Sequence, residues 1–202
     1  MMNTKWMGLV LFLVLACMPI LGAAQNEAVS AIMKLGGTIE FDNKLPGIPV
    51  VKVDLHGTKV SDSDLKLIES LSELRVLDLR LTNISDSGVF HLKKLTRLRS
   101  LNLFRTQLSD VGLDHLIDLI ELEILLIGGT KVSDKGMAKL SPLKALKKVS
   151  IFDTEVGDPG LDHLAVLPKL ELLLLGKSKV TEVGIRKIKS IRPALSFKEP
   201  NA

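Results

Sequence analysis

The chain has 202 residues, of which 46% are hydrophobic and 25% charged, a balance that is ordinary for a globular protein and leaves room for about one domain. Aromatic residues make up only 3% and tyrosine is absent, so the core has to be aliphatic. The formal net charge is +4, and the lysines are scattered without interleaved aromatic residues. This mild, dispersed charge argues against nucleic acid as a partner.

Residues 1–24 are organised differently from the rest of the chain. Lys5 precedes an uninterrupted apolar run over residues 7–16, and small residues lead up to Ala24. A basic start, an apolar stretch and small residues, in this order, are typical of a secretory signal peptide. We expect cleavage after Ala24, so that the mature chain begins at Gln25.

Two other interpretations of this segment stay open. Residues 14–17 loosely resemble a bacterial lipobox, which would make Cys17 a lipidated residue, although the chain stays apolar beyond it. An uncleaved membrane anchor is the third interpretation, for which the apolar run is short. Every one of them predicts an exported protein that is periplasmic, cell-surface or secreted, and contacts the membrane only through the signal peptide or a lipidated Cys17. Because Cys17 is the only cysteine, cleavage after Ala24 would leave no disulfide, which is more typical of a bacterial protein than of an animal extracellular module.

Three kinds of residue recur at a fixed period of 24 residues along the chain. The hydroxyl column is Thr58, Thr82, Thr106, Thr130, Thr154 and Ser178; the acid column is Asp62, Asp86, Asp110, Asp134, Asp158 and Glu182; the glycine column is Gly88, Gly112, Gly136, Gly160 and Gly184. A period in this range predicts stacked structural repeats, each of which buries its apolar side only against its neighbours. The first unit departs from the pattern, with Asp64 in the glycine column, as expected of a capping repeat.

The second unit, residues 74–97, shows what each repeat should form. Leu77 and Leu79 stand at alternate positions, which predicts a short strand with one buried face. Thr82 follows at the turn, where we expect its hydroxyl to bond the backbone of the neighbouring repeat. Asp86 is expected to accept hydrogen bonds from the free amide groups at the start of its own helix. Apolar residues at helical spacing come next and predict the buried side of that helix.

The stretch LRVLDLRLTNI at residues 74–84 resembles the core of a leucine-rich repeat, with Thr in place of the usual Asn. The following SDSGVFHLKKL, at residues 85–95, is similar to the second half of the cysteine-containing and ribonuclease-inhibitor-like repeat classes and of many predicted secreted bacterial proteins. The resemblance implies an α/β fold, a curved leucine-rich-repeat solenoid with a parallel sheet on its concave face and short helices on its convex face. It also implies a binding scaffold rather than an enzyme.

The expected organisation has four parts: a signal peptide (1–24), an N-terminal cap (25–49), six repeats (50–194), and a C-terminal cap strand and tail (195–202). In the N-terminal cap, residues 26–35 read as an amphipathic helix and residues 38–42 as a strand that covers the open edge of the sheet. Some cover is needed at each end, because an exposed sheet edge invites aggregation.

Two polar rows could be mistaken for chemical sites. His91, His115 and His163 share one helical column, but successive members lie a repeat apart, at least about 4.8 Å, whereas the ligands of one zinc ion converge to about 2 Å from it. The acid column resembles a calcium row only superficially, because helix capping accounts for it. We also find no phosphate loop, nucleophile elbow or paired carboxylates, so we expect no metal, no cofactor and no catalysis.

The outward positions of the strands are the best candidates for a binding site, because the repeat itself does not account for them. They are charged in the N-terminal half, where Asp78 and Arg80 stand, and apolar in the C-terminal half, with Phe104, Ile124, Leu126, Phe152, Leu172 and Leu174. An apolar patch on a monomer usually marks an interaction site, which predicts an unknown protein partner for this face. Two alternatives stay open: the residues pack only against one another, or they close a homodimer. A structural or self-associating component of the cell envelope is therefore the second candidate function.

Overall fold

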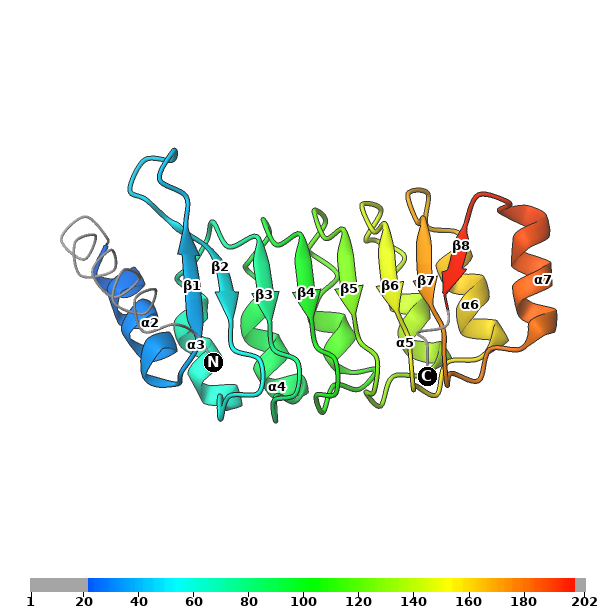
Figure 1. The fold of residues 1–202 in the computed structure, drawn as a ribbon, viewed down its shortest axis with the longest axis horizontal. Helices are drawn as coiled ribbons and strands as arrows, with labels where there is room; N and C mark the ends of the chain where they lie inside the picture. The colour runs from blue at the N-terminus through cyan, green and yellow to red at the C-terminus, as the bar shows by residue number, and fades with distance from the viewer. Residues whose placement is uncertain (1–21, 199–202) are drawn as a thin grey trace, which may run out of the picture.

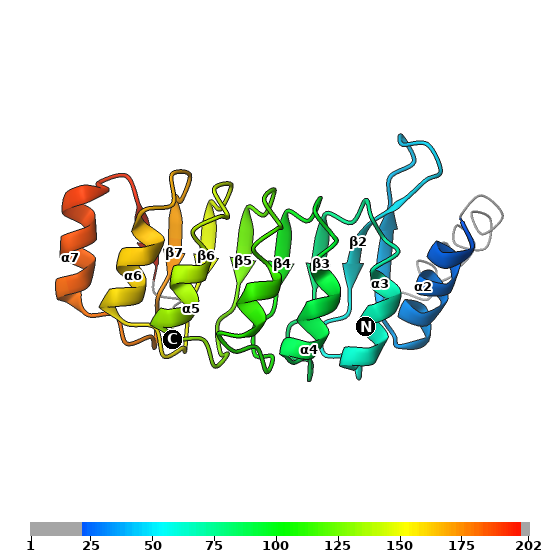
Figure 2. The ribbon, with the colours of Figure 1, turned by 180° about the vertical axis from the view of Figure 1, so that it is seen from behind.

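The computed structural model describes residues 22–198, so the signal-peptide and lipidation predictions for residues 1–21, Cys17 included, lie outside it. The strands form one eight-stranded sheet whose spatial order follows the sequence, with helices on one side and an open face on the other (Figures 1 and 2). The strands are β1 (Thr38–Phe41), β2 (Val50–Asp54), β3 (Val76–Asp78), β4 (Ser100–Asn102), β5 (Ile124–Leu126), β6 (Lys148–Ser150), β7 (Leu172–Leu174) and β8 (Ser196–Lys198).

Each strand except β1 and β8 is followed by helical structure that lies behind the sheet (Figure 2). The α-helices are α2 (Ala23–Lys34), α3 (Leu65–Ile68), α4 (Asp86–Val89), α5 (Asp134–Lys139), α6 (Asp158–Ala165) and α7 (Glu182–Ile191), and the 3₁₀ turns are η1 (Asp62–Asp64), η2 (Phe90–Leu92) and η3 (Gly112–His115). Within the described residues, no helix is both long and apolar enough to cross a membrane. The architecture is the predicted solenoid.

The core is a continuous aliphatic layer between the sheet and the helices. In β3, β4, β5 and β7 the middle residue is buried and its two neighbours are half-buried, as alternation predicts, whereas in β6 Ser150 is buried as well as Val149. Leu77, Leu101 and Leu125 pair in register on adjacent strands and are at most 1% exposed. Every repeat therefore contributes its inward side chains to the same column as the repeat before it.

The N-terminal cap differs from the expectation in two respects. Helix α2 begins at Ala23, three residues before the predicted start, and β1 pairs antiparallel with β2 while all other neighbouring strands pair parallel. The antiparallel pairing follows from chain length, because residues 42–49 are too few for the crossover that parallel strands need. Together, α2 and β1 cover the first repeat, and Ala28 and Val29 of α2 are fully buried.

At the other end, Arg192 joins the last helix to the end of the fifth repeat and the start of the sixth. Its guanidinium donates hydrogen bonds to the carbonyl oxygens of Ala165, Leu167 and Leu170 at 2.8, 2.8 and 2.9 Å. Strand β8 then pairs parallel with β7. The side chain thus satisfies three carbonyl groups where helix α6 and the following turn end.

The hydroxyl column stabilises each turn from within its own repeat. The Thr82 hydroxyl donates to the carbonyl oxygen of Leu79 at 2.6 Å, three residues earlier, and Thr106 bonds Leu103 in the same way at 2.8 Å. The prediction that these hydroxyls bond the neighbouring repeat is therefore wrong. The reason is the tightness of the turn, which brings the strand's own last carbonyl within reach.

The acid column binds the next repeat rather than capping its own helix, so this prediction is corrected as well. Ser85 is the N-cap of α4, and its hydroxyl accepts a hydrogen bond from the Ser87 amide. The Asp86 carboxylate instead accepts bonds from the backbone amide and the hydroxyl of Ser109, at 2.8 and 2.5 Å. The carboxylate of each such acid thus lies against the residues that begin the helical segment of the following unit.

The same contact joins every pair of successive repeats. The amide donors lie 2.8 Å from the carboxylate in all five junctions, which are Asp62 to Ser85, Asp86 to Ser109, Asp110 to Ser133, Asp134 to Gly157 and Asp158 to Thr181. Gly157 has no hydroxyl, and at this junction the amide of Gly160 supplies a second bond at 2.9 Å. We call these contacts the acid staples.

The acid staples also account for the glycine column. A Cβ atom at Gly160 would lie 2.5 Å from the Asp134 carboxylate oxygen, and at the other four positions it would approach the corresponding acid more closely still. Asp64 has no repeat with such an acid before it, so a side chain fits there, and it completes a capping box with Ser61. The first unit departs from the pattern because the N-terminal cap that precedes it places no carboxylate at this position.

Candidate functional site

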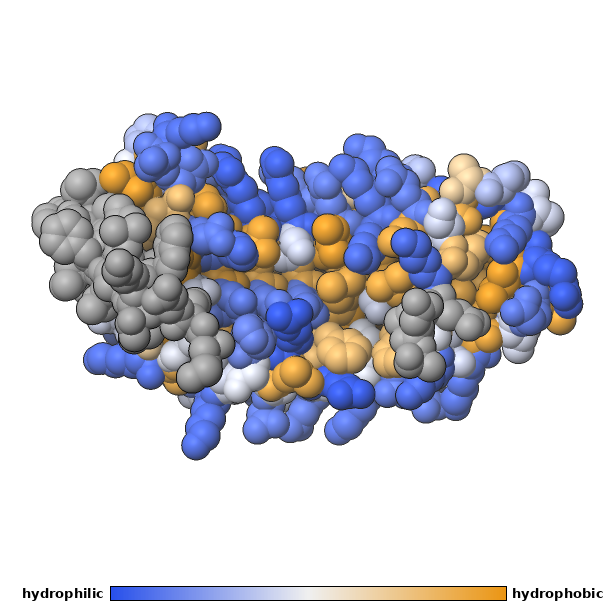
Figure 3. Space-filling model, viewed as in Figure 1, coloured by the Kyte–Doolittle hydropathy of each residue, from blue (hydrophilic) through white to orange (hydrophobic). Residues whose placement is uncertain are grey.

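The register of the sheet brings the outward residues of β4 to β7 into two rows on the concave face, by which we mean the sheet face opposite the helices. One row is Ser100, Ile124, Lys148 and Leu172, and the next is Asn102, Leu126, Ser150 and Leu174. Figure 3 shows apolar side chains gathered over the middle of this face, beside hydrophilic ones over the first strands. The predicted apolar patch is thus not contiguous along the strands, because Lys148 and Ser150 of β6 separate the apolar residues of β5 from those of β7.

Two phenylalanines meet just beyond the ends of the strands. Phe104 follows β4 and Phe152 follows β6, yet their ring centroids are only 6.2 Å apart. Gly128 lies between them on the intervening repeat, where a Cβ atom would lie 2.8 Å from the Phe152 carbonyl oxygen and 3.1 Å from the Phe104 ring. The absence of a side chain at Gly128 therefore lets the two rings form one aromatic surface, which we call the aromatic pair.

The apolar residues of the concave face are less exposed than expected. All six predicted contact residues are half-buried: Phe104, Ile124, Leu126, Phe152, Leu172 and Leu174. Ser150, which also points outward from its strand, is buried. The expectation that nothing in the monomer covers this row is therefore wrong in part. Neighbouring strands lie about 4.8 Å apart, so large side chains in one row cover each other's flanks and leave only their tips free.

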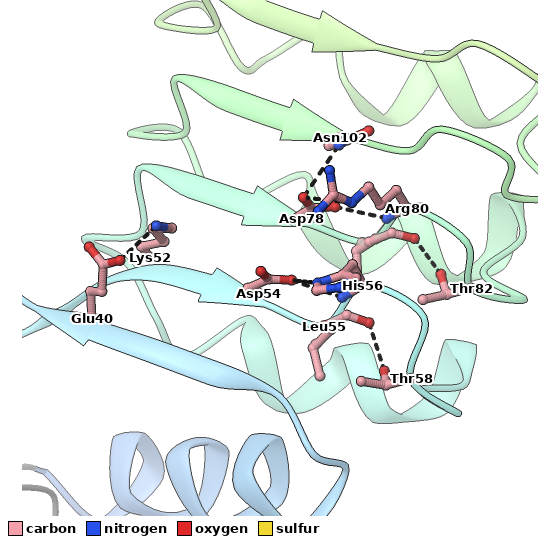
Figure 4. Close-up of polar contacts among 11 residues, drawn as sticks. Glu40, Lys52, Asp54, Leu55, His56, Thr58, Asp78, Arg80, Thr82 and Asn102 are labelled. Atoms are coloured by element: carbon pink, nitrogen blue, oxygen red, sulfur yellow. Dashed lines mark hydrogen bonds and ion pairs between the residues drawn. The ribbon is translucent and has the colours of Figure 1, made fainter. Parts of the chain in front are cut away.

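The N-terminal half of the face is a set of internally paired charges (Figure 4). Asp54 accepts from the backbone amide of His56 and contacts its Nδ1 at 2.9 and 2.7 Å. Asp78 lies 3.4 Å from Arg80 Nε and accepts from the amide group of Asn102 at 3.3 Å. The predicted contact residues Asp78 and Arg80 therefore pair with each other.

Burial alone would raise the pKa of Asp54, but the hydrogen bonds from the backbone and ring of His56 outweigh it and lower the pKa. The carboxylate is held in its ionised form, as a partner for His56 and for the Arg80 charge nearby. With its charges already matched, this half of the face has little unsatisfied attraction for a ligand.

The histidine column does not converge on one point. His91 Nδ1 contacts Glu69 at 2.5 Å, and this hydrogen bond lowers the pKa of Glu69. His115 instead lies edge-on to the ring of Phe90, with centroids 5.3 Å apart. In the part of the chain that the structure describes, no group of three His, Cys, Asp or Glu side chains is placed to hold a metal ion.

Sequence reasoning missed a second apolar area, on the helix side. Phe90 is 41% and Val111 59% exposed, and with Asp86, Ser87 and His115 they line a shallow hollow of about 340 Å³. Helical periodicity could not reveal it, because η2 and η3 are 3₁₀ turns whose side chains follow a different period.

Comparisons with known proteins agree with this architecture. A family model described as a leucine-rich repeat matches residues 71–93 and 94–116. A search of curated proteins found no significant match. Among solved structures, the leucine-rich-repeat ectodomain of a receptor kinase from Arabidopsis thaliana has a TM-score of 0.53 at 14% identity, with 79% of this chain and 94% of that one covered.

Two bacterial structures are also similar. A leucine-rich-repeat protein from Leptospira interrogans has a TM-score of 0.53 at 18% identity over 66% of this chain, and an internalin from Listeria monocytogenes has 0.47 at 19% identity over 77%. This chain spans 55% of the internalin chain and 33% of the Leptospira one. The 24-residue period, the single-layer sheet backed by helices and the family match over residues 71–116 all lead to the same conclusion: this chain has the leucine-rich-repeat fold.

Proposed function

We propose that this protein is an exported, non-catalytic scaffold that binds a protein partner through the C-terminal half of its concave face. Solenoids of this kind generally use their extended concave surface for protein binding. The observation that carries the proposal is the aromatic pair, Phe104 and Phe152, beside apolar strand residues on a sheet face that none of the helices within residues 22–198 covers. Large apolar tips at the centre of an open face are the usual anchors of a protein interface.

In this proposal the contact residues are the six apolar side chains of the face, with Asp78 and Arg80 at its polar margin. The partial burial of the six favours recognition, because side chains already held by their neighbours lose little conformational freedom on binding. The shallow, ungated shape of the face favours a macromolecule over a small substrate, which would need a concave pocket.

A double substitution, Leu126→Ser with Phe152→Ser, tests the site. Both side chains lie outside the core column of Leu125 and Ile127, so the thermal unfolding midpoint should stay within a few degrees of the parent. Capture of the partner, identified by cross-linking and mass spectrometry on the exported fraction, should fall at least about tenfold, which corresponds to about 1.4 kcal/mol.

The matched control is Ile120→Ser with Val166→Ser, which removes two apolar side chains that are 63% and 65% exposed outside the concave strands. It should leave capture unchanged. Early unfolding of the first double variant would mean that the concave residues are structural, and loss of capture in the control alone would move the site away from the concave face.

Export has its own test, because it rests on the sequence of residues 1–24 alone. A reporter fused behind residues 1–25 should leave the cytoplasm, and the mature terminus should be Gln25. Recovery of a lipidated Cys17 would favour the lipoprotein, and retention of the reporter in the cytoplasm would refute export.

Self-association is the second candidate, and the exposed apolar side chains Phe90 and Val111 favour it. Light scattering over a range of concentrations separates the two functions. A mass that rises with concentration, and returns to that of a monomer when Phe90 is replaced by Ser, would support an envelope component rather than a receptor-like scaffold.

A further inference from the structure

Three basic side chains in the apolar half of the concave face have no acidic partner within ion-pair distance in the described part of the chain, and two of them lie beside the aromatic pair. Lys148 lies on β6. Arg105 directly follows Phe104 beyond the end of β4, and Lys177 lies three residues beyond the end of β7. Among residues 22–198, none of the three has a carboxylate oxygen within 4 Å, whereas nearby bases such as Lys147 do. Asp153, exposed directly after Phe152, offsets part of this charge, but the three unpaired bases outnumber it, so this region of the concave face carries an excess of positive charge.

The geometry fixes where these charges stand. Arg105 crosses the bare backbone of Gly129, where a Cβ atom would lie 2.6 Å from the Arg105 side chain, and its guanidinium carbon is 5.2 Å from the Phe104 ring centroid. Lys177 approaches from the other side, with Nζ 5.7 Å from the Phe152 centroid. Two cations thus bracket the aromatic pair.

Lys148 has a different setting. It is half-buried and pairs in register with Ile124 on one side and Leu172 on the other, so its stem lies among apolar side chains. An ammonium group in such surroundings is less screened by water than one on a helix surface, so a carboxylate brought to it interacts more strongly.

We propose that the partner segment recognised here is acidic as well as apolar: an extended polypeptide whose apolar side chains rest on the aromatic pair and whose carboxylates meet Lys148, Arg105 and Lys177. The inference rests on the proposed function and names the chemistry of its ligand. The charged N-terminal half does not offer the same attraction, because Asp54 with His56 and Asp78 with Arg80 are paired already. Charge complementarity of this kind selects partners and raises association rates.

The size of the patch sets the probe. Four strands at a spacing of about 4.8 Å span about 15 Å, the length of about five extended residues, so a peptide of about ten residues covers it. The probe is a fluorescein-labelled peptide in which glutamate alternates with phenylalanine and leucine. Two matched peptides carry lysine in place of every glutamate, or serine in place of every apolar residue. Fluorescence anisotropy should show binding of the first peptide and at least tenfold weaker binding of the other two.

Charge-reversal variants test the named residues. Arg105→Glu, Lys148→Glu and Lys177→Glu together should weaken binding of the acidic apolar peptide at least tenfold. The control, Lys66→Glu, Lys94→Glu and Lys135→Glu, makes the same change in net charge on exposed residues of the helix side and should change binding less than twofold. Circular dichroism confirms that both variants fold. Equal losses in the two variants, or equal binding of the lysine peptide, would overturn the proposal.

Three further outcomes separate the proposals. Binding to anionic phospholipid vesicles with no preference among the peptides would replace the polypeptide by a membrane surface and refute the inference. If the Leu126 and Phe152 substitutions abolish capture of the natural partner while the charge reversal does not, the proposed site stands and only the acidic partner is refuted. If neither variant affects capture, both proposals fail.

Discussion

The substitution Gly136→Ala should destabilise the protein, although alanine is the better helix former. A Cβ atom at this position would overlap the Asp110 carboxylate and lie 2.8 Å from a methyl carbon of Leu113. The carboxylate would have to leave the Ser133 amide and hydroxyl, which it now accepts from at 2.8 and 2.6 Å. One added methyl group therefore opens an acid staple between the third and fourth repeats.

The magnitude follows from three contributions. Losing two hydrogen bonds to a half-buried carboxylate costs about 2–3 kcal/mol. Overpacking against Leu113 costs about 1 kcal/mol more, and the higher helix propensity of alanine returns about 1 kcal/mol. We expect a net loss of about 2–3 kcal/mol for Gly136→Ala, and a similar loss for Asp110→Ala, which removes the same two bonds.

The double variant, Gly136→Ala with Asp110→Ala, makes the test specific. Once the carboxylate is absent, the Cβ atom no longer displaces it, so the double variant should lose about 2–3 kcal/mol rather than the sum of the single losses. Urea unfolding followed by circular dichroism gives all three values and should show a coupling of about 2 kcal/mol. Additive losses, within about 0.5 kcal/mol, would mean that the glycine column does not exist to accommodate the acids.

Three further predictions concern stability. Thr106→Val leaves a buried carbonyl without its donor and should cost about 1–3 kcal/mol in urea unfolding, whereas the same change at the more exposed Ser178 should cost less; equal losses would count against the turn role. Hydrogen bonds from the Thr181 amide and hydroxyl lower the pKa of Asp158 below its ordinary value of 3.8, so this stability is present above about pH 4 and is lost as the pH falls; Asp158→Asn should therefore flatten the dependence of the unfolding midpoint on pH between about 5 and 2, and an unchanged slope would refute it. Leu81 has a φ of 58°, in the left-handed region, and is 51% exposed, so Leu81→Gly should raise stability by about 0.5–1 kcal/mol, and a loss of stability would show that its side chain contributes packing.

The period of the sequence was enough to predict the solenoid, the strand facing and the core columns. Buried residues such as Leu125 and Ile151 occupy the positions that alternation assigned to them. The roles of the polar columns could not be predicted in the same way. Ser85 and Asp86 are adjacent and both suit a helix start, and only the structure shows that the serine caps its own helix while the acid reaches 23 residues ahead to Ser109.

The candidate site was predictable in its location more than in its details. Alternation identifies Phe104 and Phe152 as outward residues, but their contact depends on Gly128, which leaves the same position of the intervening repeat without a side chain. The cations that bracket them depend on the turn that follows each strand, where Arg105 and Lys177 have φ values of 54° and 59°. Such left-handed conformations at basic residues are not expected from sequence, because glycine is their usual occupant.

The acid staples make the internal repeats interchangeable. Each internal unit presents a carboxylate to the unit after it, and a backbone amide and a glycine to the unit before it. The amide contact therefore recurs at every junction, although Gly157 lacks the hydroxyl found at the others. A duplication or loss of 24 residues would therefore leave every junction intact and the chain still able to fold. The same event would bring different side chains together on the concave face; loss of the fourth repeat, for example, would place Arg105 beside Asp153. Recombination of whole repeats is thus a route by which a protein of this design could acquire a new binding specificity in a single genetic step.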